Sequence, residues 1–514
     1  MYQRPAQKQG KHRTFEASFH TQLHHEHLCR TYGVLLFREQ AGGTACTCGK
    51  IKPTHALLNK TYPELASYLI PVKLESEPGK YMLIHGYTGA IDIVTESLLK
   101  KIQAAASGVD LPEDTLQALI KRGYITTRSQ EEEYAYVARM AKALHKKDYL
   151  LYTNFTWVVT YNCNFRCPYC FEGRDKKDGD HRIVFTQEMV DKAFRAMEQI
   201  QPHKELRKKV ITLYGGEPLL AENKEIVSYI INEGITRGYK FVAITNGYDL
   251  DCYGDLLSPD KIYKVQITVD GPKKLHDCKR IHYRYGETFD KIVENIQFAL
   301  NHSIKVTIRM NMDTSNINQY NDLKKFFEKK GFFQNPQFEL YSAILKNNDS
   351  ISTDEHRKLD FLSIGSFITK NQKINKEWGK EYNGISKKIY KALSEKRALL
   401  LSSVSCAAQV NGYVLDPLGD IYPCWEVIGN KKHLEGSFLN DTIVWNNDVV
   451  KVWHNTNVCK DELCAKCRYA LLCCGGCPYY HMRGENMQCT FYKRTFAIEV
   501  NKAYAQYNKL LIKS

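Results

Sequence analysis

The stretch that decides the fold is Cys163-Asn164-Phe165-Arg166-Cys167-Pro168-Tyr169-Cys170, in which three cysteines follow the spacing C-x3-C-x2-C. Four cysteine thiolates are the ordinary ligands of a 4Fe–4S cluster, so three of them leave one iron open to another ligand. Gly215-Gly216-Glu217-Pro218 follows later, directly after the strand-like run Val210–Tyr214. A zinc loop or a set of buried cysteines is the alternative interpretation. The aromatic Tyr169 before the third cysteine and the downstream motif favour the cluster.

The two motifs resemble those of the radical SAM superfamily, and the similarity extends over about residues 80 to 492. The resemblance implies that Cys163, Cys167 and Cys170 hold a 4Fe–4S cluster whose open iron is chelated by S-adenosyl-L-methionine. An electron from the cluster would split this cofactor into methionine and a 5′-deoxyadenosyl radical that abstracts a substrate hydrogen. The resemblance also implies a one-electron donor such as flavodoxin or ferredoxin.

Further residues are assigned to the cofactor by the same resemblance. Glycine permits a close backbone approach and a carboxylate pairs with an ammonium, so Gly215, Gly216 and Glu217 are expected to bind the methionyl amino group. Arg280 is expected to meet the cofactor carboxylate. Thr245-Asn246-Gly247 is either a neighbour of the site or a simple turn. The full expected cofactor-binding set is Tyr169, Gly215, Gly216, Glu217, Thr268, Asp270, Arg280 and Arg309.

Strand-like and helix-like patterns alternate from Thr156 to about Ser342. The strand-like runs are Phe155–Thr160, Val210–Tyr214, Phe241–Thr245, Val265–Val269, Val306–Met310 and Phe338–Ser342. Helix-like stretches include Glu188–Ile200 and Thr288–Leu300. The alternation predicts an α/β fold with a parallel sheet. Periodicity does not separate an open sheet from a barrel. The resemblance implies a partial (β/α)6 TIM-like barrel with its site at the C-terminal strand ends.

A second group of cysteines begins after residue 405. Its members are Cys406, Cys424, Cys464, Cys467, Cys473, Cys477 and Cys489. Zinc ribbons also use C-x2-C pairs, but the seven-cysteine spacing resembles the SPASM domain, which carries auxiliary iron–sulfur clusters. Asp416-Pro417-Leu418-Gly419-Asp420 reads as the turn of a small hairpin between the first two of these cysteines.

The SPASM resemblance divides the seven cysteines into two ligand sets. Cys464, Cys467, Cys473 and Cys489 would hold one 4Fe–4S cluster, which makes three clusters in the protein if the second set also binds one. That second set, Cys406, Cys424 and Cys477, is one ligand short. A substrate thiolate could occupy the open iron, and Cys459 or Cys474 could instead replace the missing ligand.

The resemblance implies a peptide maturase, an oxidoreductase-type enzyme that forms a thioether or carbon–carbon cross-link in a ribosomally made peptide. The alternative is a sulfatase maturase, which makes formylglycine from Cys or Ser. Such relatives carry an aspartate base directly after the second array cysteine, where this chain has Trp425. Glu426 is therefore the candidate catalytic base. A non-catalytic iron–sulfur electron carrier or scaffold would not need the Gly-Gly-Glu-Pro motif or Arg280.

Residues 80–150 are expected to form a small domain ahead of the barrel. Tyr81–Ile84 and Ile91–Val94 read as strands, followed by helices near Glu96–Ala105 and Pro112–Lys121. The pattern is similar to the winged-helix-like domain of radical SAM enzymes that act on ribosomal peptides. There it binds the leader of the precursor peptide as an added strand. A packing appendage without a ligand is the alternative.

The remaining domain boundaries follow from these motifs. We expect the barrel over 151–345, a helical linker over 346–404 and the SPASM domain over 405–514. Residues 1–79 are unassigned, and their metal-like residues are interpreted as part of a surface helix. Those residues are His20, His24, His25, His27 and Cys29, with Cys46-Thr47-Cys48 further on.

The composition of the chain limits which partners and which cellular compartment we expect. The chain has 514 residues, 17 cysteines and a formal net charge of +15. No apolar stretch is long enough to span a membrane, and no signal peptide is evident, which predicts a cytoplasmic protein without a membrane partner. Cysteines in that compartment indicate metal binding rather than disulfides. The basic residues are spread along the chain, which disfavours nucleic acid as a partner.

Overall fold

The computed structural model describes residues 64–104, 111–173, 183–345, 384–484 and 487–513. All of them belong to one compact unit, Tyr62–Ser514. The metal-like residues between His20 and Cys48 lie outside the described residues, as does most of the linker predicted over 346–404. Within the described part of the chain, no helix is long and apolar enough to cross a membrane.

Six parallel strands form the main sheet, and each one pairs with the strand next to it in sequence. They are β6 Thr153–Thr160, β7 Arg207–Gly215, β8 Lys240–Thr245, β9 Ile262–Thr268, β10 Lys305–Met312 and β11 Phe338–Ile344. Every strand-like run named from the sequence lies in one of them, apart from a residue at the end of β9. Because the order never reverses, all the right-handed crossovers leave on the same face. The predicted α/β fold with a parallel sheet is confirmed.

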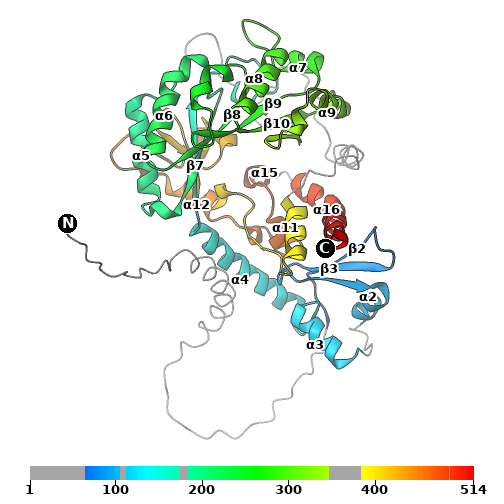
Figure 1. Ribbon diagram of the computed structural model, residues 1–514. Coiled ribbons are helices and arrows are strands. Elements are labelled where there is room, and N and C mark those ends of the chain that lie inside the picture. The colour runs from blue at the N-terminus through cyan, green and yellow to red at the C-terminus, as the bar shows by residue number, and fades with distance from the viewer. Residues whose placement is uncertain (1–63, 105–110, 174–182, 346–383, 485–486, 514) are drawn as a thin grey trace, which may run out of the picture. The chain divides into compact units, whose positions relative to one another are not determined.

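Helices follow the strands and surround them in Figure 1. They are α5 Gln187–Ile200, α6 Lys224–Thr236, α7 Lys273–Lys279, α8 Phe289–Asn301 and α9 Tyr320–Lys329. In α5, the Thr186 side chain accepts a hydrogen bond from the Met189 amide and so caps the helix. Val190, Ala193 and Met197 of this helix are buried against the sheet at the i, i+3, i+7 spacing of an amphipathic helix.

The predicted C-terminal hairpin is present and extends the main sheet. It consists of β12 Gly412–Leu415 and β13 Asp420–Tyr422, and Gly419 has a φ of +80° in the turn. β12 pairs in parallel with β6, and two short antiparallel strands, β14 Gly436–Ser437 and β15 Val444–Trp445, complete a ten-stranded mixed sheet. The cysteine-rich region is therefore hydrogen-bonded to the parallel strands.

The small N-terminal domain contains the predicted strands and helices. Its sheet comprises β2 Leu69–Lys73, β3 Lys80–His85 and β4 Ile91–Thr95, in that order. β2 precedes the domain boundary predicted at residue 80. The other elements are β1 Glu64–Leu65, α2 Glu96–Gln103, α3 Glu113–Arg122 and β5 Ile125–Thr126, followed by the connecting helix α4 Gln130–Tyr149.

The chain from residue 384 onward contains the C-terminal helices. They are α11 Gly384–Ser394, α12 Asn447–His454, α13 Glu462–Ala465, α14 Ala470–Cys473, α15 Pro478–Met482 and α16 Met487–Lys513. Ile389 of α11 and Val500 of α16 are buried in one cluster with Val72 of β2 and Met82 of β3. The small domain thus packs on α11 and α16 through its sheet.

Candidate active site and cluster-binding loops

The first cysteine loop follows directly after β6. Cys163, Cys167 and Cys170 are all partly buried. Burial raises the pKa of the Cys167 thiol to about 12, Arg280 lowers it, and the charges of Cys170 and Cys163 raise it further. The Cys163 and Cys170 thiolates would thus act on the Cys167 sulfur from within the same loop.

The spacing of the cysteines suits a cluster better than a single ion. Among the described residues, no three His, Cys, Asp or Glu side chains gather closely enough to hold one metal ion. A cubane binds each thiolate to a different iron, so its ligands lie further apart than those of tetrahedral zinc. Three thiols and no fourth donor in the loop fit a 4Fe–4S cluster with one open iron.

The Gly-Gly-Glu motif at the end of β7 holds this loop in place. The Gly216 amide donates to the Thr160 carbonyl at 2.9 Å, and the Glu217 amide donates to the Asn162 carbonyl at 2.7 Å. A Cβ at Gly216 would lie 2.3 Å from the Asn162 carbonyl oxygen. Gly215 has a φ of +131°, a conformation that favours glycine. Both glycines therefore let two backbones approach closely beside Cys163.

Glu217 is buried and bonded to the protein through both carboxylate oxygens. Thr245 Oγ1 donates to Oε1 at 2.6 Å, the Leu219 amide donates to the same oxygen at 2.8 Å, and the Asn246 amide donates to Oε2 at 2.5 Å. Burial raises its pKa to about 7, and these donors lower it. Thr245-Asn246-Gly247 is thus a direct neighbour of the Gly-Gly-Glu motif and not an isolated turn.

Tyr169, Asp270 and Arg280 form one hydrogen-bonded group at the C-terminal end of β9. Arg280 Nη1 donates to the Tyr169 hydroxyl at 2.9 Å, and that hydroxyl donates to Asp270. The Asn311 amide, at the end of β10, donates to the other Asp270 oxygen at 3.0 Å. Tyr169 is therefore brought together with Asp270 and Arg280, two expected cofactor-binding residues more than 100 positions further along the chain.

Two arginines lie near Asp270, one directly after α7 and one near the C-terminal end of β10. Arg309 of β10 pairs in register with Thr268 of β9, which places both beside Asp270. The buried Nε atoms of Arg280 and Arg309 have no hydrogen-bond partner among the described residues. Buried polar atoms in native proteins are normally paired. These donors therefore suit an anionic group such as the carboxylate of S-adenosyl-L-methionine.

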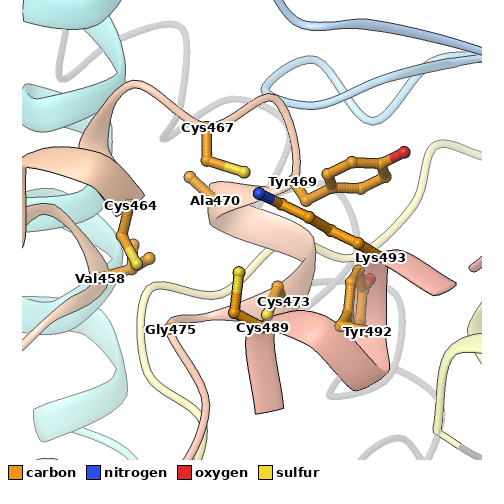
Figure 2. A pocket seen from close by; sticks show the side chains of 10 residues that line it. All are labelled: Val458, Cys464, Cys467, Tyr469, Ala470, Cys473, Gly475, Cys489, Tyr492 and Lys493. Carbon is orange, nitrogen blue, oxygen red and sulfur yellow. The ribbon is translucent and has the colours of Figure 1, made fainter. Parts of the chain in front are cut away.

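One C-terminal cysteine set surrounds a cavity. Figure 2 shows Cys464, Cys467, Cys473 and Cys489 around it, together with Tyr492 and Lys493. The cysteines come from α13, the following loop, α14 and the first turn of α16. The structure thus brings together the four residues that the sequence assigned to one cluster, and four thiols around a cavity fit a closed 4Fe–4S ligand set.

The second C-terminal set is also assembled. Burial raises the pKa of Cys424, and the charges of Cys406 and Cys477 add to the rise. The two suggested replacement ligands are engaged elsewhere: the Cys474 thiol donates to the Ser402 carbonyl at 3.3 Å, and Cys459 packs near Cys464. Neither shares the apolar cluster in which Cys424 and Cys477 lie.

An aromatic contact joins the parallel strands to this second set. Trp425 is 40% exposed and stacks on Tyr214, the residue before Gly215, with ring centroids 5.6 Å apart and planes inclined by 27°. Burial raises the pKa of Tyr214, and the charges of Glu172 and Glu426 raise it further. Sequence reasoning named Trp425 and Glu426 but missed Tyr214 and Glu172. The position of Tyr214 at a strand end beside the motif was the available signal.

A hydrogen bond makes a second connection between the two regions. The Tyr161 hydroxyl, directly after β6, donates to Asp416 Oδ2 at 2.7 Å. Asp416 is fully buried in the β12–β13 turn, and its Oδ1 accepts from the Leu418 and Asp420 amides. Sequence reasoning also missed this pair, because residues 255 positions apart give no local signal.

Comparison with known proteins identifies the family. The radical SAM superfamily profile matches residues 157–327. The chain belongs to the radical SAM superfamily. Its members use S-adenosyl-L-methionine with a 4Fe–4S cluster, so the protein is a radical SAM enzyme. The matched residues contain the cysteine loop, the Gly-Gly-Glu motif and the group around Asp270.

Relatives match over a larger part of this radical SAM enzyme. The cysteine-type anaerobic sulfatase-maturating enzyme of Clostridium novyi is 22% identical over 365 residues, which is 66% of this chain and 93% of the relative. That of Clostridium perfringens is 26% identical over 371 residues, covering 65% and 92%. The solved structure of native anSMEcpe with bound AdoMet and Cp18Cys peptide matches with a TM-score of 0.51 at 18% identity, over 69% of this chain and 99% of that one. This last similarity shows a shared fold.

Proposed function

We propose that this radical SAM enzyme modifies a ribosomally made precursor peptide by forming a thioether or carbon–carbon cross-link. In this proposal the parallel strands are a partial (β/α)6 barrel over about residues 151–345, and residues 405–514 are a SPASM domain with two auxiliary 4Fe–4S clusters. The small domain ahead of the barrel is winged-helix-like and would bind the peptide leader. The observation that carries the proposal is the three-cysteine set beside the Tyr214–Trp425 contact.

The roles of individual residues follow from their positions. Bound at the first cysteine loop, the cofactor and its cluster would supply the radical that removes a substrate hydrogen. Arg280 and Arg309 would hold the cofactor through their unpaired donors, and Tyr169 and Asp270 orient Arg280. Gly216 keeps the cysteine loop close to β7. The carboxylate best placed near the three-cysteine set is Glu426, which we assign as the catalytic base.

A cross-link explains the three-cysteine set better than formylglycine does. In this proposal, Cys406, Cys424 and Cys477 leave one coordination position that no other cysteine among the described residues fills, and a substrate cysteine would take it. A metal ion deprotonates a coordinating thiol, which prepares the sulfur for bond formation. Trp425 stands directly after Cys424 and has no proton-accepting group. Its stacked ring would instead line the space in which the peptide lies.

The sulfatase-maturase alternative rests on a different observation. The curated relatives of that name match over 92% and 93% of their own length. Under this alternative, Glu426 would take over the role of the missing aspartate and the product would be formylglycine.

The proposed leader-binding site is one edge of the small domain's sheet. The outer edge of β2 faces α16, whose Asn501 donates to the Lys73 carbonyl at 3.1 Å and accepts from the Glu75 amide at 2.8 Å. β4 Ile91–Thr95 pairs with β3 on one side only among the described strands. Arg122 donates a hydrogen bond to the Ile91 carbonyl oxygen, so this oxygen is already bonded within the domain. We therefore assign the leader to the rest of the β4 edge, where it would add a strand.

Mass spectrometry of the peptide product tests the proposed function. The reconstituted enzyme is incubated with reductant, S-adenosyl-L-methionine and the precursor peptide encoded beside its gene. A thioether lowers the mass by about two hydrogens for each link and removes one alkylatable thiol, as expected if a coordinated cysteine reacts. A two-hydrogen loss with the thiol still alkylatable indicates a carbon–carbon link. A mass change matching formylglycine would establish the alternative, and an unchanged cofactor would refute catalysis altogether.

A further inference from the structure

A short hairpin over residues 281–286 is bound to the first cysteine loop. The Arg166 amide donates to the Ile281 carbonyl at 2.8 Å, and the Tyr283 amide donates to the Asn164 carbonyl at 3.0 Å. These bonds pair the hairpin antiparallel to the loop, with Phe165 opposite His282. His282 and Gly286 close the turn by exchanging two backbone hydrogen bonds at 2.9 and 3.0 Å. The hairpin therefore lies against residues that separate two of the cluster-binding cysteines.

The hairpin carries aromatic side chains into solvent. Tyr285 is 69% exposed and Tyr283 is 49% exposed. Beneath them His282 is buried, and its ring lies 5.2 Å from that of Tyr283 and 4.7 Å from that of Tyr285. Large exposed aromatic groups that cluster in this way mark binding surfaces more often than scattered single residues do.

Two exposed arginines flank the same tyrosine. The guanidinium groups of Arg166 and Arg284 lie 5.2 and 5.1 Å from the centre of the Tyr283 ring. Neither arginine forms an ion pair with any described residue. Arg166 also donates to the Cys163 carbonyl at 2.8 Å. One of the two guanidinium groups is therefore hydrogen-bonded to the backbone of an expected cluster ligand. We call Arg166, Tyr283, Arg284 and Tyr285 the arginine–tyrosine patch.

We propose that the arginine–tyrosine patch is the docking surface for an acidic one-electron carrier protein of the flavodoxin or ferredoxin class. Unpaired cationic charge favours an acidic partner and speeds its association. The patch adjoins the cysteine loop, and electrons enter a protein most readily where the donor can approach the acceptor closely. This inference rests on the proposed function, in which the first cluster must be reduced from outside. The carrier loses one electron, the cluster gains it, and no bond is made or broken.

Stopped-flow reduction of the first cluster tests this surface. Photoreduced flavodoxin is mixed with wild-type enzyme and with the double variant Arg284→Gln/Tyr285→Ser, and the loss of cluster absorbance is followed at low and high salt. We expect the second-order rate constant of the variant to fall by about tenfold at low salt, because steering is lost, and to depend less on salt. Lys208→Gln, an exposed charge near the opposite end of β7, is the matched control and should react like the wild type.

Reduction by dithionite is the control that distinguishes a loss of flavodoxin docking from damage to the cluster. Dithionite is a small reductant and needs no docking surface. Equal losses with flavodoxin and dithionite would show that the hairpin only supports the loop, and an unchanged flavodoxin rate would also overturn the proposal. A weaker affinity for precursor peptide with normal flavodoxin reduction would assign the patch to the peptide instead. Failure of dithionite-reduced wild-type enzyme to cleave the cofactor would contradict the proposed function, independently of the docking result.

Discussion

The two cysteine-rich regions of this enzyme are built in opposite ways. Cys163, Cys167 and Cys170 lie within eight consecutive residues at the end of a buried parallel strand. The C-terminal cysteines are drawn from Cys406 to Cys489, and two of them, Cys464 and Cys473, lie on helices of only four residues, α13 and α14. The first site is shaped by a sheet that would persist without metal. The second has little regular structure of its own.

Under the proposed function, this difference predicts where metal contributes to folding. Backbone hydrogen bonds from Gly216 and Glu217 hold the first loop, and the large core of the parallel sheet lies beneath it. The C-terminal sets are supported by apolar clusters that are smaller than this core. Where ligands converge from separate short segments, the free energy of metal binding becomes free energy of folding. The site on the parallel sheet should therefore tolerate loss of its cluster better than the C-terminal region does.

The largest effect is expected from removing whole ligand sets. Wild-type enzyme should bind about twelve irons, four for each of three clusters. Replacing Cys163, Cys167 and Cys170 by alanine should remove about a third of the iron and all cofactor cleavage, while the melting temperature changes little. Replacing Cys464, Cys467 and Cys473 should remove a similar share of iron and also lower the melting temperature strongly, because the supports of α16 are lost.

Iron analysis, cofactor cleavage and thermal melting of both triple variants check this contrast. Equal losses of melting temperature would break the comparison between a pre-formed and a metal-dependent site. Retained cofactor cleavage without Cys163, Cys167 and Cys170 would contradict the assignment of the first loop.

A smaller effect is expected from Gly216→Ala. The added Cβ would lie 2.3 Å from the Asn162 carbonyl oxygen and 2.6 Å from that of Tyr161, so the cysteine loop must move. Such overpacking costs about 1–3 kcal/mol, and cofactor affinity should fall by about ten- to a hundredfold. Equilibrium dialysis with S-adenosyl-L-methionine measures the loss. Gly384→Ala is the matched control, because no atom lies within 4 Å of its Cβ position, and its affinity should equal that of wild type.

The last effect, on stability rather than on cofactor binding, is expected at the junction of the two regions. Burial raises the pKa of Asp416 from 3.8 to about 7. Between these values the folded protein binds more protons than the unfolded chain, so its free energy of unfolding falls as the pH rises from about 4 to about 7. The loss is about 4 kcal/mol at most. Asp416→Asn lacks this titration and can still bond to Tyr161.

Thermal melting at pH 5 and pH 8 measures that contribution. The melting temperature of the wild type should fall more between the two pH values than that of Asp416→Asn, by a few degrees. Parallel pH profiles for the two proteins would show that Asp416 is ionised in the folded state and that the Tyr161 contact stabilises the carboxylate.

The parallel sheet could be predicted from sequence because its signals are local. Val210–Tyr214 is a short apolar run before a glycine pair, and the structure places it in β7. Glu188–Ile200 shows the 3.6-residue period and a threonine cap, and α5 begins one residue earlier. Each of these patterns predicts the secondary structure of its own residues. When strands and helices alternate regularly along the chain, few sheet topologies are possible.

Contacts between distant segments could not be predicted in the same way. The parallel pairing of β12 with β6 joins residues more than 250 positions apart. The sequence of a short strand does not indicate which other strand it pairs with. The Trp425–Tyr214 stack has the same origin. Tyr169, Asp270 and Arg280 were named through family resemblance, but their mutual hydrogen bonds follow from the convergence of strand ends. Sequence patterns thus identified the groups, and the topology determined their neighbours.

Helix α16 has a consequence for the order in which the protein is made. It carries Cys489 in its first turn and places Phe496, Val500 and Tyr504 in the core shared with β2 and β3. A ribosome synthesises β2 roughly 400 residues before α16, an interval of roughly 20 to 80 seconds. During that time the small domain exposes an incomplete apolar face. Under the proposed function, the folding of this domain and the binding of the cluster held by Cys489 would therefore both wait for the end of synthesis.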